Sequence, residues 1–140
     1  MRTDNRLSRV LHALLHLDGM DRPATSDEMG HMLNTNPAVV RRIMGGLRDA
    51  GFVTSVKGHG GGWTLTRSLS EITLLQVYDA LGEPTLFALG PSEDAPSCLL
   101  ERAANEALGD ALQTAQTLFR EELSGVTVAD LATTANAQRA

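Results

Sequence analysis

Two adjacent arginines, Arg41 and Arg42, lie in a segment whose neighbouring residues are small or apolar. A guanidinium group can form two hydrogen bonds to O6 and N7 of guanine, or it can bind a phosphate. In a helix, Ala38 and Gly45 share the side of these arginines and allow the backbone to approach a ligand closely. An arginine pair is more often a solvated helix face. The elements around this pair, described below, favour instead contact with the major groove of DNA, and weakly indicate guanine in the bound sequence.

A second basic group is Lys57, the single lysine of the chain, which precedes the glycine-rich segment 58–62. A basic side chain beside a turn without bulk can enter a minor groove or bind the flanking phosphates. The alternative is a mobile turn that touches nothing. Hydroxyl groups and the amides at a helix start are suitable phosphate ligands. The predicted DNA-contacting residues are Thr25, Ser26, Asn36, Pro37, Ala38, Arg41, Arg42, Lys57, Gly58, His59 and Gly60.

The charges are distributed unevenly along the chain, although the formal net charge is −5. Residues 1–67 carry nine basic and six acidic side chains, a net of +3, whereas residues 68–140 carry three and eleven, a net of −8. Charge patterning bears on binding partners more than on fold. The first half alone is therefore expected to meet a polyanion.

Helix signals place these candidates in three short helices. An apolar stripe over residues 4–18, ended by Gly19, predicts the first. A capping box at 25–28 starts a second helix, which ends near Leu33. Asn36 as N-cap and Pro37 at the first position start the third, which continues to residue 50 before Gly51. The face of this third helix that is expected to be buried consists of Val40, Ile43, Met44 and Leu47.

After Gly51 the pattern changes from helix to hairpin. Residues 52–56 and 63–66 read as two strands joined by the glycine-rich turn. Three helices, with a short turn at 34–37, followed by a hairpin predict a winged helix-turn-helix. The fold class is mainly α with a small β-hairpin. We expect a winged-helix DNA-binding domain at 1–67, a short helix and linker at 68–96, and a long helix with a short C-terminal helix at 97–140.

The length and composition exclude several classes of protein. The chain has 140 residues, 42% of them hydrophobic and 21% charged, which is typical of one soluble globular domain. No run approaches a membrane span and no signal-peptide core is present, so a cytoplasmic location is expected. The sequence contains no phosphate-binding loop or nucleophile–base set, so an enzyme is the weakest interpretation. The competing interpretation is a winged helix that binds proteins and not DNA.

The segments N-T-N-P-A-V-V-R-R-I, L-R-D-A-G-F-V, K-G-H-G-G-G-W-T-L and E-I-T-L-L-Q-V-Y-D-A-L resemble the Rrf2 family of bacterial transcriptional regulators. N-T-N-P followed by V-V-R-R is most similar to its YwnA-like branch. The resemblance covers about residues 1–83 well and the later helices in length and order only. It implies a transcriptional regulator that binds a palindromic operator in promoter DNA as a homodimer. We expect this regulator to be a repressor. The resemblance also implies that Ala38, Arg41, Arg42 and Lys57 face the DNA.

An alanine–leucine stripe in the long helix supports the homodimer independently of the resemblance. A stripe this broad needs a facing helix, and its alanines permit a close approach of the two backbones. The effector is unknown from the sequence. The residues expected at the dimer interface are Leu100, Ala104, Ala107, Leu108, Ala111, Leu112, Ala115 and Phe119.

Cys98, the single cysteine, is a candidate for sensing. Its place near a helix N-terminus favours the thiolate, which would make oxidation or an intersubunit disulfide possible. The nearby acidic residues Glu93, Asp94 and Glu101 disfavour the anion, and a plain buried cysteine is at least as good an interpretation.

No metal or cofactor is expected. Some members of the family that the chain resembles hold an iron–sulfur cluster with three closely spaced cysteines, which one cysteine cannot supply. A cluster bound by Cys98 together with histidine and glutamate ligands is the less favoured alternative. His12 and His16 have the spacing of a metal pair but lack an evident third ligand, so they are interpreted as part of a half-exposed helix face.

Overall fold

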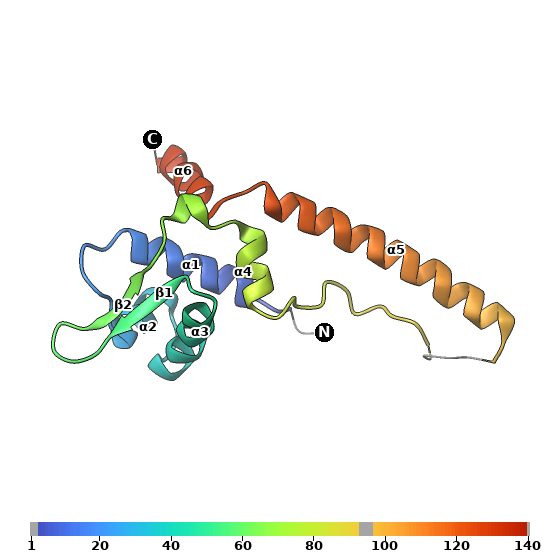
Figure 1. Cartoon of the computed structure of the whole chain (residues 1–140), viewed down its shortest axis with the longest axis horizontal. Coiled ribbons are helices and arrows are strands. Elements are labelled where there is room, and N and C mark those ends of the chain that lie inside the picture. The colour runs from blue at the N-terminus through green and yellow to red at the C-terminus, as the bar shows by residue number, and fades with distance from the viewer. Residues whose placement is uncertain (1–2, 93–96, 140) are drawn as a thin grey trace.

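The structure, a computed structural model, describes residues 3–92 and 97–139 (Figure 1). Its described part is mainly helical, with one antiparallel hairpin, so the predicted fold class is confirmed. The elements in order are α1 (Arg6–Asp18), α2 (Ser26–Leu33), α3 (Pro37–Asp49), β1 (Val53–Val56), β2 (Gly62–Leu65), the 3-10 turn η1 (Leu69–Glu71), α4 (Leu74–Ala80), α5 (Leu99–Ser124) and α6 (Val128–Arg139).

Helices α2 and α3 begin at the predicted caps. The Thr25 hydroxyl accepts a hydrogen bond from the Glu28 amide at 3.1 Å, and the Glu28 carboxylate accepts one from the Thr25 amide at 3.2 Å. The turn between the helices is tight, because a side chain on Gly30 would place its Cβ 2.8 Å from the Thr35 carbonyl oxygen. Asn34 reverses the chain in the left-handed conformation, with φ of 54°. The glycine and the left-handed asparagine together position α3 against α2.

The hairpin pairs Val53 with Leu65 and Val56 with Gly62 at its two ends. Its second strand also pairs with the segment before α2, through two hydrogen bonds of 2.8 and 3.0 Å between Ala24 and Trp63. Gly62, at φ of 143°, is required there, because a Cβ would lie 2.5 Å from the Ala24 carbonyl oxygen. The hairpin is therefore attached to the helical core along one edge.

Helix α6 packs back onto α1 and η1, and Val128 at its start is fully buried in the same core as the N-terminal helices. A short bridge holds it there, with the Leu74 amide donating to the Val126 carbonyl and the Val128 amide to the Ile72 carbonyl. No pattern in the sequence indicates that the chain returns to the core here.

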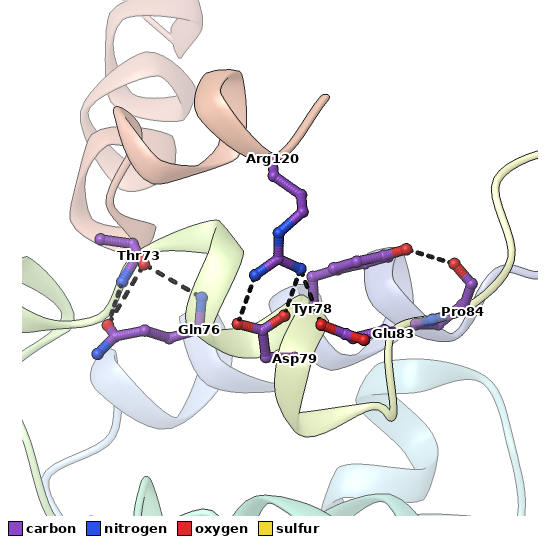
Figure 2. Close-up of polar contacts among 7 residues, drawn as sticks. All are labelled: Thr73, Gln76, Tyr78, Asp79, Glu83, Pro84 and Arg120. Carbon is purple, nitrogen blue, oxygen red and sulfur yellow. Dashed lines mark hydrogen bonds and ion pairs between the residues drawn. The ribbon is translucent and has the colours of Figure 1, made fainter. Parts of the chain in front are cut away.

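Helix α5 projects away from the rest of the molecule (Figure 1) and has no buried residue over its 26 positions. Ser92 of the linker is hydrogen-bonded to Glu101 and Asn105 near its N-terminal end, and its C-terminal end is anchored on α4. Arg120 binds Asp79 through contacts of 2.8 and 3.3 Å and Glu83 at 3.1 Å, as Figure 2 shows, and Phe119 lies edge-on to Tyr78. Within residues 3–92 and 97–139, none of the helices combines the length and apolar character needed to cross a bilayer.

Candidate DNA-binding surface

Helix α3 has one buried face and one exposed face. Val40, Met44 and Leu47 are buried in the core and Ile43 packs against it, as the sequence predicted. On the other face Ala38, Arg41 and Arg42 are exposed and Gly45 is half-exposed. Within the described part of the chain, neither arginine forms an ion pair. Both guanidinium groups are thus available to an external ligand.

The start of α3 offers fewer phosphate ligands than a typical helix N-terminus. Pro37 has no amide hydrogen, and the Val39 amide donates to the Asn36 side chain at 3.0 Å. The amide of Ala38 remains as a donor of this first turn. At α2, the hydroxyls of Thr25 and Ser26 already accept hydrogen bonds from the Glu28 amide and the Trp63 indole, but each still has its own hydrogen to donate.

The start of α2 is fixed by an ion pair that the sequence analysis did not identify. Arg22 binds Glu28 with both terminal nitrogens, at 2.9 and 2.6 Å. Together with the Thr25 amide, this arginine lowers the pKa of Glu28 from 4.5 to about 2. The same carboxylate therefore closes the capping box and holds the preceding loop, which leads into the strand contact at Ala24.

We expect the contribution of Glu28 to stability to depend on pH. Because the pKa is lower in the folded chain, the stabilisation is complete above about pH 4.5 and is lost as pH falls toward 2. Glu28→Gln should lower the midpoint of thermal unfolding at pH 7, and its difference from the native chain should shrink steadily below pH 4.5. Circular dichroism melts of both proteins from pH 7 to 2.5 measure this. A difference that does not vary with pH would contradict the role of the carboxylate.

The tip of the hairpin is exposed from Val56 to Gly60, and Lys57, Gly58, His59 and Gly60 all belong to this stretch. The turn is sharp, since a Cβ on Gly61 would lie 2.1 Å from the Val56 carbonyl oxygen. At its base, the Trp63 indole donates to Ser26 at 3.1 Å and so links the hairpin to α2. Lys57 forms no ion pair with any described residue.

The predicted DNA-contacting residues come from three elements at one end of the molecule. In Figure 1, α2, α3 and the hairpin lie together, while α5 extends in a different direction. The tail helix α6 lies on the far side of α1 and does not cover α3. This end presents exposed cations from α3 and the hairpin, beside the hydroxyls at the start of α2.

Cys98 is exposed and forms the N-cap of α5. The backbone amides of Glu101 and Leu100, at the start of the helix, lower the pKa of its thiol from 9.0. The interpretation of Cys98 as a plain buried cysteine is therefore wrong. Two of the acidic residues expected to oppose the thiolate, Glu93 and Asp94, lie outside the described residues.

The residues predicted for the dimer interface divide between two faces of α5. Half of the set are half-buried and face the protein's own chain; these are Leu108, Leu112, Ala115 and Phe119. Leu112 borders the linker, and Phe119 contacts Tyr78. The other four, Leu100, Ala104, Ala107 and Ala111, are exposed and continue to Thr114 and Leu118 at alternating spacings of four and three residues. We call these six residues, 100, 104, 107, 111, 114 and 118, the free seam.

Comparison with known proteins finds a matching family model, curated relatives and solved structures. The Rrf2 family model, described as an iron-dependent transcriptional regulator, matches residues 3–134. YwnA of Bacillus subtilis strain 168, provisionally named an HTH-type transcriptional regulator, is 31% identical over 129 residues, which are 91% of this chain and 95% of that protein. A provisionally assigned transcriptional regulator from Lactobacillus plantarum has a structure with a TM-score of 0.79 at 29% identity, covering 94% of this chain and 90% of that one. CymR, the global cysteine regulator of B. subtilis, has a TM-score of 0.66 at 20% identity over 96% of this chain and 98% of that one, and so shows the fold alone.

The iron in the family description does not fit the donors of this chain. The sequence has one cysteine, and in residues 3–92 and 97–139 no three histidine, cysteine, aspartate or glutamate side chains gather as a metal site would require. His12 and His16 do meet, with Nε2 atoms 2.8 Å apart, but they are a pair. These residues therefore do not form a cluster site of the cysteine-ligated kind.

Proposed function

The chain belongs to the Rrf2 family and is a DNA-binding transcriptional regulator, and we propose that it represses transcription as a homodimer on a palindromic operator. Each α3 lies in a major groove, with Ala38, Arg41 and Arg42 nearest the bases. Each hairpin reaches the flanking minor groove or its phosphates with Lys57. No iron–sulfur cluster takes part.

One observation carries the DNA-binding surface: the outer face of α3 presents two exposed arginines without acidic partners among the described residues, over a fully packed inner face. A solvated structural helix normally pairs some of its cations with nearby carboxylates. Here Arg48, about two turns further on, does so with Asp49 at 3.6 Å. A salt-dependent gel shift on promoter DNA tests the assignment, with the substitutions given in the Discussion.

The free seam of α5 supports the homodimer. Its Leu100 and Leu118 are 83% and 59% exposed, and the alanines between them leave room for a second backbone. Spacings of four and three residues are those of a helix that packs along its length on another helix. An identical helix crossing on a twofold axis would bury this seam on both copies at once.

We also propose that Cys98 responds to oxidants. Because its pKa is lowered, the thiol should be alkylated by iodoacetamide with a pH midpoint below 9.0. Mass spectrometry of the native chain after timed alkylation at several pH values measures this. Cys98→Ser is the control for labelling elsewhere. A midpoint at or above 9.0 would remove the basis for a sensing role.

A further inference from the structure

A cavity of about 500 Å³ lies where the DNA-binding part of the molecule meets α5. Its walls come from four elements: the start of α1 with Leu7, α4 with Tyr78, the linker with Phe87, and the C-terminal part of α5 with Phe119. This volume is within the range of small-molecule sites in proteins. Any molecule in the cavity would touch α1 and α4, which pack against α2 and α3, and also the helix that carries the free seam.

The lining of the cavity is aromatic to an unusual degree for this chain. The sequence has five aromatic residues, three phenylalanines, one tyrosine and one tryptophan, and three of the five line this cavity. The other two, Phe52 and Trp63, are buried in the core. Phe87 lies at the cavity while 46% exposed, and no core packing accounts for a large apolar side chain there. Aromatic walls of this kind fit a flat aromatic ligand by stacked or edge-on contact.

The polar groups of the cavity favour a neutral ligand that donates a hydrogen bond. The Tyr78 hydroxyl donates to the Pro84 carbonyl, as Figure 2 shows, so its oxygen remains free to accept. Asp4 lines the cavity, and its carboxylate is held by Arg6 through contacts of 2.8 to 3.1 Å. Beyond the wall, Arg120 is occupied by Asp79 and Glu83. Because both arginines are paired, an anionic ligand would meet the Asp4 carboxylate and no unpaired cation among the described residues that line the cavity.

The position of the cavity separates its occupant from a second copy of the chain. Phe119 belongs to the face of α5 that packs on its own α4, whereas the free seam runs along the exposed face. A partner helix on the seam therefore leaves the cavity to a different molecule. We propose that this cavity binds a small, uncharged aromatic compound with one hydrogen-bond donor, and that the compound regulates DNA binding by changing the orientation of α5 relative to α1 and α4. The regulatory half of this proposal rests on the proposed function.

Direct binding to the full chain tests the site without DNA. Three naphthalenes of similar size serve as probes in isothermal titration: 1-naphthol, 1-methoxynaphthalene without the donor, and 1-naphthoate with a negative charge. We expect 1-naphthol to bind one per chain, the ether more weakly, and 1-naphthoate not to bind. Equal binding of all three, or binding that does not saturate, would overturn the site.

Substitutions place the ligand in the cavity. Phe87→Ala removes one half-exposed wall and should weaken 1-naphthol binding about tenfold. Leu99→Ala, at an exposed leucine away from the cavity, should change nothing. Tyr78→Phe keeps the ring and should make 1-naphthol and its ether bind equally. If Phe87→Ala instead dissociated the dimer, and the native chain did not bind 1-naphthol, a second copy of the chain would occupy the cavity. The proposal would then be wrong.

The regulatory half has its own measurement. Saturating 1-naphthol should change the affinity of the native chain for its DNA by about fivefold or more, and should have no effect in Phe87→Ala at the same concentration. If 1-naphthol occupies the cavity and the affinity for DNA does not change, the proposed regulation is wrong, whereas the binding site itself is still supported. Failure of the chain to bind any DNA, with one-to-one binding of 1-naphthol intact, would instead contradict the proposed function.

Discussion

Replacing Arg41 and Arg42 together by alanine is expected to weaken operator binding by about 100-fold or more, because two bidentate contacts are each worth about 1–3 kcal/mol. The fold should not change, since both side chains are exposed and the packed face of α3 is on the opposite side. Fluorescence anisotropy with an operator selected from a randomised DNA pool measures the loss. The selected sites should contain guanine where the arginines reach the bases.

The matched control is Arg102→Ala with Arg139→Ala, which removes the same charge from exposed positions on α5 and α6. This control should bind DNA within about twofold of the native chain at physiological salt, because charges beyond a Debye length of ~8 Å are screened. The α3 variant should also show a shallower dependence of affinity on salt if either arginine binds phosphate. Equal losses in the two variants would mean that overall charge, and not α3, determines binding. If neither variant nor the native chain bound DNA, the interpretation of the chain as a protein-binding winged helix would be favoured.

Ala107→Glu is expected to convert the proposed homodimer to monomers, with a dissociation constant raised by at least about 100-fold, because an unpaired charge buried in an interface costs about 3–5 kcal/mol. Ala107 lies near the middle of the free seam, so a twofold crossing there brings the two new carboxylates close together. Sedimentation velocity over a range of concentrations measures the change. Binding to a full palindromic site should fall as well, because each copy then holds its half-site alone.

Gln113→Glu is the control for this change. It adds a negative charge to an exposed position of the same helix, beside the seam and not on it. It should leave the dimer intact. If Ala107→Glu remained dimeric at low concentration while retaining its helix content, the free seam would not be the interface.

The sequence was informative where contacts are local. The caps at Thr25 and Asn36 each depend on a hydrogen bond between residues three apart, and both are present. The glycine-rich turn and the buried face of α3 follow in the same way from spacing within one element. These features fix the winged helix before any distant contact is considered.

The contacts that join distant segments could not be predicted from the sequence. Nothing near Val128 in the sequence shows that it returns to the core, because the backbone group that it pairs with, the Ile72 carbonyl, lies far away along the chain. The alanine–leucine stripe of α5 is broad. The packing of Phe119 on Tyr78 shows which side of the stripe contacts the rest of the same chain. Arg22 and Glu28 are six residues apart, outside the spacing of helix pairs, so their ion pair was missed as well.

A photo-crosslinking experiment tests most directly whether α3 and the hairpin face DNA together. A benzophenone amino acid is placed singly at Arg42, at Lys57 and, as a reference, at exposed Glu106 on α5, and each chain is irradiated with the selected operator. We expect crosslinks from positions 42 and 57 within one half-site, and none from position 106. Crosslinks from 106 alone, or from neither 42 nor 57 while the DNA is bound, would contradict this expectation.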